Sequence, residues 1–111
     1  MTLEEAEGMV AAFMRLYSLH GWKFEWMQPR KKFRRAGQCA WSRKTIMLQP
    51  YFARCNYPFI VKRTVLHEIA HALVGARNGH NRVWKEMAIK IGDDGGVRYG
   101  KEVKKRLRRK K

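Results

Sequence analysis

Apolar residues recur with helical spacing in three segments of the chain. The first covers residues 2–20, opens with the capping-box pattern Thr-x-x-Glu and stops before Gly21. The second covers residues 58–75; Pro58 suits its first turn, and its apolar positions follow the helical spacing of three and four. The third covers residues 82–91, with an apolar stripe formed by Val83, Trp84, Met87, Ala88 and Ile91. These patterns predict three helices.

Between the first two helices the pattern changes to that of short strands. Residues 22–26 alternate aromatic and charged side chains, and residues 38–41 and 45–48 are two further short segments joined by a tight turn. Residues 51–57 read as a connection with a short helical turn. The order predicts an α+β fold with a small antiparallel sheet of about three strands. We expect residues 45–48 to be an exposed edge strand, where an extended peptide could pair.

Length and composition indicate one domain followed by a charged tail. A chain of 111 residues has room for a single core, which we assign to residues 1–97. The glycine-rich segment 92–96 ends that domain, and the pair Asp93-Asp94 within it reads as a turn. Residues 98–111 hold nine Lys and Arg against the single acid Glu102, so this tail is too basic to bury.

The net charge of +16 points to a polyanionic partner. Nucleic acid is the natural one, with DNA as the form we expect, because each phosphate contact releases counterions and adds affinity that depends little on sequence. A tail that merely solubilises the protein is the alternative. The basic side chains that we expect to contact nucleic acid are Arg30, Lys31, Lys32, Arg34 and Arg35 in one cluster, and Lys104, Lys105, Arg106, Arg108 and Arg109 in the tail.

The remaining composition argues for a cytoplasmic monomer. No run reaches the ~20 apolar residues that a membrane span needs, and the acidic start of the chain lacks the basic residues of a secretory signal. Cys39 and Cys55 show no metal-binding spacing, so we expect two free thiols. We expect the protein near the nucleoid of a bacterium, with a phage genome as another source, and we expect no membrane partner.

The second helix contains His67-Glu68-Ile69-Ala70-His71, an HExxH motif. Residues four apart on a helix point the same way, so the two imidazoles can hold one Zn²⁺ per chain. Glu68 lies beside the open coordination position, where a carboxylate can act as general base toward a water molecule. The alternative without a metal site is an amphipathic helix whose histidines are satisfied by hydrogen bonds. The apolar positions next to both histidines favour a buried metal site instead.

A catalytic zinc takes three protein ligands, so one more is required. His80 follows a stretch with two glycines and an asparagine that ends the helix and turns the chain back. The rival ligand is Glu86 on the third helix. We favour His80 because imidazole is the commonest metal-binding side chain. His20, near the end of the first helix, reads as an ordinary terminal histidine.

Several linked segments resemble the SprT-like (Spartan-type) metalloproteases. His67–Ala76, HEIAHALVGA, is similar to the family's active-site helix, and the segment from His80 to Lys85 resembles its H-G-x-x-W/F-K element. Residues 36–41 and 45–48 resemble its G-x-C and I-x-L strands. The resemblance spans residues 10–92 and implies a zincin-like fold and an endopeptidase. It also implies that His80 is the third zinc ligand and that DNA-bound or DNA-crosslinked proteins are the substrates.

Two features depart from that family. Asn81 stands where a glycine is usual, and we expect it to adopt the left-handed backbone that asparagine tolerates. The chain also has a basic tail in place of the cysteine-rich zinc ribbon of some relatives, and so resembles a minimal form. The alternative function is a non-catalytic nucleic-acid-binding protein stabilised by zinc. Structural zinc sites normally have four ligands, often cysteines, so three histidines beside Glu68 favour catalysis.

Overall fold

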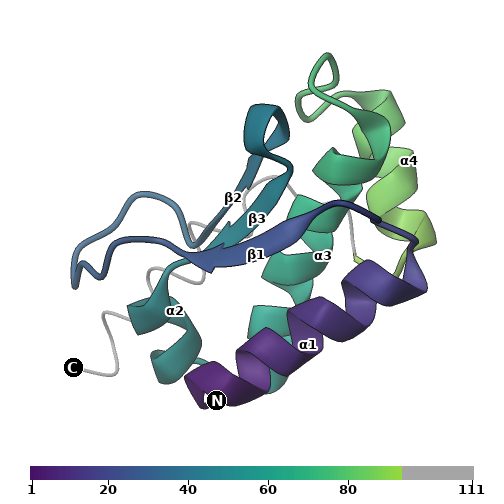
Figure 1. The fold of residues 1–111 in the computed structure, drawn as a ribbon. Coiled ribbons are helices and arrows are strands. Elements are labelled where there is room, and N and C mark those ends of the chain that lie inside the picture. Colours follow the sequence, from purple (N-terminus) through teal and green to yellow (C-terminus); the bar gives the residue numbers. More distant parts are fainter. Residues whose placement is uncertain (94–111) are drawn as a thin grey trace.

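The computed structural model describes residues 1–93 and has an α+β fold (Figure 1). Its elements are α1 (Leu3–Leu16), β1 (Lys23–Trp26), β2 (Gly37–Ala40), a 3₁₀ turn η1 (Trp41–Arg43), β3 (Thr45–Leu48), α2 (Pro50–Cys55), α3 (Pro58–Val74) and α4 (Arg82–Lys90). Helix α3 runs through the middle of the molecule, with the sheet on one side and α1 and α4 packed along it. The three predicted helices and three predicted strands are all present, and the predicted helical turn in the connection is α2.

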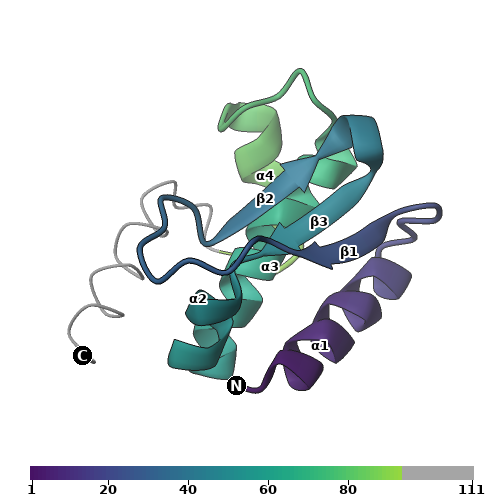
Figure 2. The same ribbon diagram turned by 60° about the vertical axis from the view of Figure 1, so that its left-hand side comes forward.

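The sheet is mixed, so the prediction of an antiparallel sheet was wrong in one pairing. The strand order is β1-β3-β2; β2 pairs antiparallel with β3, whereas β1 pairs parallel with it. The connection between β1 and β2 is long and projects beyond the end of the sheet (Figure 2). The connection leaves a space one strand wide between β1 and β2. After β2 the chain turns through a short hairpin, and β3 occupies that space.

This order also corrects the expected edge. Residues 45–48 form the central strand β3, bonded on both sides, and so cannot pair with an added peptide. Its side chains of Ile46 and Leu48 are fully buried. The free edges belong to β1 and β2, and β2 is the strand that lies against α3.

Helix α1 begins as predicted and ends earlier than predicted. The Thr2 hydroxyl accepts a hydrogen bond from the Glu5 backbone N–H at 3.0 Å, and the Glu5 carboxylate accepts one from the Thr2 N–H at 2.8 Å. The helix stops at Leu16 because Ser18 adopts a left-handed backbone with φ 55°. The Leu19 N–H then reaches back to a carbonyl in the last turn, which is the Schellman arrangement usually formed by glycine.

Helix α3 has the predicted bounds and forms the centre of the core. Pro58 stands in its first turn, and Gly75 ends it with φ 91°, a conformation that a side chain would strain. The helix is buried on several faces, because the sheet, α1 and α4 all pack on it. Burying one large aliphatic side chain contributes about 1.5–3 kcal/mol, and the helix buries Ile60, Val61, Val65, Leu66 and Ile69.

Helix α4 starts at a side-chain cap that the sequence interpretation missed. Asn81 has extended backbone, φ −81° and ψ −175°, so the expected left-handed conformation was wrong. Its side-chain oxygen accepts a hydrogen bond from the Trp84 backbone N–H at 3.1 Å, which is what an N-cap does. Trp84, Ala88 and Ile91 are buried as predicted, whereas Val83 is 52% exposed and does not belong to the stripe.

Two smaller expectations are also settled for the described residues. Cys39 and Cys55 are free thiols, as expected. Within residues 1–93, no helix combines the length and apolar character that a bilayer crossing requires. Asp93, expected in a turn, directly follows a turn at residues 91–92 and is buried, with a carboxylate oxygen 3.7 Å from the Arg63 guanidinium of α3; Asp94 lies outside the described residues.

Candidate metal centre

Three histidines converge beside the C-terminal half of α3. His67 and His71 project from successive turns of the helix, and the loop after Gly75 brings His80 back to them. The Nε2 atom of His80 lies 3.0 Å from that of His67 and 3.1 Å from that of His71. The loop is held by Asn78, whose side-chain amide donates to the Val74 carbonyl at 2.8 Å.

This spacing fits a tetrahedral zinc ion. With Zn–N distances of ~2.0–2.1 Å and tetrahedral angles, ligand nitrogens lie about 3.3–3.4 Å apart. Both separations from His80 are within a few tenths of an ångström of that value, and the three ligand atoms all lie within 4.8 Å of one another. Among residues 1–93, these three histidines are the group whose potential ligand atoms lie close enough together to hold a metal ion.

The structure selects His80 over Glu86 as the residue that meets the motif histidines. Glu86 lies on the exposed side of α4 and forms an ion pair with Arg82, with 2.9 Å between the guanidinium Nε and the carboxylate. It is absent from the histidine cluster. His20, exposed in the loop after α1, is also not part of that cluster, in keeping with the plain role expected for it.

Partial loss of solvation keeps these imidazoles neutral, as metal coordination requires; His71 is buried, His67 half-buried and His80 exposed. Loss of solvation lowers the pKa of His67 to about 3, with smaller contributions from the charges of His71 and His80. The pKa of His71 falls to about 4, again mainly through burial, and that of His80 is lowered in the same direction. At neutral pH each ring therefore offers an unprotonated nitrogen.

Two tryptophans hold the histidines in place. The Trp84 ring is fully buried and lies 4.6 Å, 5.2 Å and 4.7 Å, centroid to centroid, from the rings of His67, His71 and His80. Its indole N–H donates to the His67 carbonyl at 3.3 Å. Trp41 approaches from the other side; its N–H donates to the His71 carbonyl at 2.9 Å. Trp84 was expected to be a packing residue, and what it packs against is the metal centre itself.

Strand β2 lies directly on the carboxyl group of Glu68. A Cβ atom added to Gly37 would lie 3.1 Å from Glu68 Cγ, 3.2 Å from its Oε2 and 3.1 Å from Thr64 Cγ2. Only a glycine lets the strand come this close without a shift. The sequence interpretation assigned no role to Gly37 beyond its place in the family's strand pattern, because the contact joins residues 31 positions apart.

Burial dominates the acid–base properties of Glu68. Its side chain is 8% exposed, and desolvation raises the pKa of the carboxyl group to about 8, while the charge of Arg35 lowers it in part. Burial and the charge of Glu68 together raise the pKa of Cys39 to about 12. Cys39 is thus a neutral thiol near the carboxylate and, as expected, is not one of the clustered ligands.

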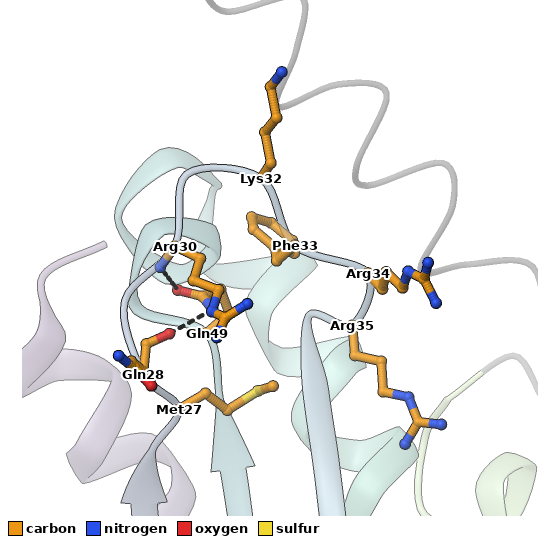
Figure 3. A pocket seen from close by; sticks show the side chains of 8 residues that line it. All are labelled: Met27, Gln28, Arg30, Lys32, Phe33, Arg34, Arg35 and Gln49. Carbon is orange, nitrogen blue, oxygen red and sulfur yellow. Dashed lines mark hydrogen bonds between the residues drawn. The ribbon is translucent and has the colours of Figure 1, made fainter.

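The basic loop residues gather around one cavity. Arg30, Lys32, Arg34 and Arg35 are among the residues lining a space of about 660 Å³ between β1 and β2 (Figure 3). Lys31 is exposed in the same loop and does not line it. The predicted tail, residues 98–111, lies outside the described residues. So do the domain boundary after residue 97 and the tail residues proposed to bind DNA, Lys104, Lys105, Arg106, Arg108 and Arg109.

Comparison with known proteins gives one match. The model of the SprT-like family matches residues 5–106, which is nearly the whole chain. No curated protein and no solved structure matches it. The fold, a small sheet beside a long central helix, is compatible with a zincin-like arrangement. A match of this extent indicates a metalloprotease-like function.

Proposed function

We propose that this chain, which belongs to the SprT-like family, is a zinc-dependent endopeptidase that acts on proteins associated with or crosslinked to DNA. One observation carries the proposal: three imidazoles with lowered pKa values converge on one point beside α3, and the motif carboxylate Glu68 directly follows His67 in that helix. Three nitrogen ligands leave a tetrahedral metal one free position, which is the arrangement of catalytic rather than structural zinc.

His67, His71 and His80 would hold the Zn²⁺, which when bound polarises a scissile carbonyl and makes water more acidic. Glu68 takes the proton of the attacking water and passes it to the leaving amine. In the metal-free chain burial raises the pKa of Glu68 to about 8 while Arg35 opposes that rise, and the charge of a bound Zn²⁺ nearby would lower the pKa and favour the carboxylate that acts as base.

The neighbouring residues fix the geometry of this step. Gly37 lets β2 lie against the Glu68 side chain and restricts where its carboxylate can point. Trp41 and Trp84 donate to the backbone carbonyls of the two motif histidines and pack on their rings. Side chains held by packing on both sides lose little freedom when they bind a metal or a substrate.

The charge of the chain supports DNA as the partner. Four cationic side chains surround one cavity next to β2, and the net charge is +16. A protease tethered to DNA meets DNA-bound proteins at high local concentration, so it needs little sequence specificity of its own. The basic tail predicted over residues 98–111 would add to the same attraction.

Glu68→Gln tests the catalytic part. The substitution keeps the shape of the side chain and removes the base, so cleavage of a DNA-bound protein should fall by about 10²–10⁴ while zinc content stays unchanged. Glu86→Gln is the matched control, because Glu86 is exposed and paired with Arg82, and it should cleave like the wild type. Undiminished cleavage by Glu68→Gln would remove Glu68 from the mechanism. A wild-type chain that binds zinc and DNA but cleaves no protein would favour the non-catalytic alternative.

A further inference from the structure

The connection between β1 and β2 forms an arch around the basic cavity. Figure 3 shows the backbone rising from Met27, turning near Lys32 and descending through Arg35 into β2. The space beneath the arch is open to solvent and measures about 660 Å³, which falls within the ~300–1,000 Å³ range of small-molecule sites. Such a cavity is notable in a loop that is otherwise polar and exposed.

The arch has a defined shape because side-chain hydrogen bonds hold its rising part and a ring contact holds its descending part. Gln49 is 1% exposed; its side-chain oxygen accepts from the Arg30 N–H at 3.2 Å, and its amide donates to the Gln28 carbonyl at 3.1 Å. On the descending side, the Phe33 ring packs edge-on against Phe52 of α2, with centroids 6.5 Å apart. The cavity is therefore preformed, which lowers the entropic cost of binding.

The lining combines positive charge with an apolar wall. Four of the eight lining residues are cationic, none is acidic, and Met27 and Phe33 supply apolar surface. Guanidinium groups are suited to phosphate, and aromatic or apolar side chains are suited to the face of a base. An acidic peptide would satisfy the cations but leave the apolar wall unused. The mixture fits a nucleotide better.

The position of the arch joins this cavity to the metal centre. Arg35 is two residues before Gly37, whose backbone lies against Glu68. Arg35 and Ala36 lead directly into β2, so two extended residues at ~3.3 Å each set an upper bound of about 7 Å on the backbone distance from the cavity wall to the carboxylate contact. A nucleotide held here would place any protein attached to it on the side of α3 that carries Glu68.

We propose that the arch cavity binds one unpaired nucleotide of single-stranded DNA and so presents a protein joined to that strand to the metal centre. The inference rests on the DNA-binding part of the proposed function and goes beyond it in naming the site, the strandedness and the reason for its location. The phosphate lies against Arg30, whose guanidinium group lies inside the arch, and the base enters toward Met27 and Phe33; Lys32, which points outward from the top of the arch, attracts the neighbouring phosphate (Figure 3).

The test compares two double variants of the full chain that lose the same charge. Arg30→Ala with Lys32→Ala alters the arch, and Lys85→Ala with Lys90→Ala removes two exposed lysines of α4. Binding of a fluorescent 12-nucleotide oligo-dT is followed by anisotropy across a salt series. The arch pair should weaken binding at least ~10-fold and reduce the salt slope by about 1.4, whereas the α4 pair should change the affinity less than ~3-fold.

Three results would overturn the proposal. Equal losses of affinity in the two double variants would mean that the arch contributes only general electrostatic attraction. An equal loss for a blunt duplex would exclude a site for an unpaired nucleotide. Competition by an oligo-glutamate as effective as by an oligonucleotide of the same charge would indicate an acidic peptide site. If the wild type binds no DNA at all, the DNA part of the proposed function fails too. This test measures binding alone, so it does not depend on whether the chain is a peptidase. A lack of peptidase activity would show only in the cleavage assay that compares the wild type with Glu68→Gln.

Discussion

Glu68→Gln should stabilise the metal-free protein, and by an amount that grows with pH. In the folded chain the carboxyl group is buried under β2, and its pKa is raised to about 8 from an ordinary value of 4.5. The folded state therefore holds a proton between these two values that the unfolded state releases. Since stability falls with pH wherever the folded state binds more protons, Glu68 destabilises the wild type progressively as pH rises from about 4.5 to about 8.

The magnitude follows from the size of that pKa difference. One unit corresponds to about 1.4 kcal/mol, so the ionisation of Glu68 costs on the order of 1 kcal/mol at pH 5, about 3 kcal/mol at pH 7 and up to about 5 kcal/mol at pH 9. Glutamine carries no such cost. His67 and His71 affect the pH dependence of stability in the opposite direction. Because their pKa values are lowered, they make the folded state more stable as pH rises from about 4 toward 6.5. That effect is common to both proteins and cancels in the comparison.

Urea unfolding of both proteins in excess chelator, from pH 5 to pH 9, measures the difference directly. A constant offset would reflect how well the glutamine amide is accommodated, so the informative quantity is the change with pH. We expect the advantage of the variant to grow by roughly 3–4 kcal/mol across the range. A difference that stays flat with pH would refute the reasoning, because it would mean that the Glu68 carboxylate is solvated in the folded chain.

Two further substitutions test the packing around the site. Gly37→Ala should cost about 1–3 kcal/mol in urea unfolding, because its Cβ would lie 3.1 Å from Glu68 Cγ; Gly8→Ala, on α1 with open space around it, should instead be neutral or stabilising. Equal effects at the two glycines would contradict the close approach of β2. Asn81→Ala should lower stability by about 1 kcal/mol in thermal unfolding through loss of the hydrogen bond from the Trp84 N–H, and Asn81→Asp should restore only part of it, because a carboxylate keeps the cap but cannot donate to the Asn78 side-chain oxygen. No loss in the alanine variant would show that the cap is unimportant.

The helices and the metal motif were predictable because their signals are local. Pro58 and Gly75 mark the two ends of α3 in the sequence. The four-residue spacing of the histidines in HExxH places both on one face of a helix, so their geometry follows from the sequence as well. The turn after Gly75 likewise indicated that His80 could return to the motif. Spacing alone left Glu86 as a rival, and His80 was preferred for its chemistry; the fold removes the rival because Glu86 faces solvent on α4.

What the sequence did not reveal depends on contacts between distant residues. The insertion of β3 between β1 and β2 follows from strand pairing across the whole sheet, which no local pattern encodes. Ser18 ends α1 in a conformation usually taken by glycine, so the stop signal was read at Gly21 instead. The contact of Gly37 with Glu68 and the bond from Trp41 to the His71 carbonyl both link β2 and its following turn to α3, and became visible only with the fold.

The central claim is that His67, His71 and His80 form one zinc site, and zinc stoichiometry tests it most directly. Metal-free chain is equilibrated with Zn²⁺, freed of excess metal and measured by elemental analysis alongside protein concentration. We predict about one zinc per chain for the wild type, for His20→Ala and for Glu86→Ala, and a large loss for His71→Ala and His80→Ala. Full zinc content in His71→Ala or His80→Ala, or its loss in Glu86→Ala, would contradict the site described.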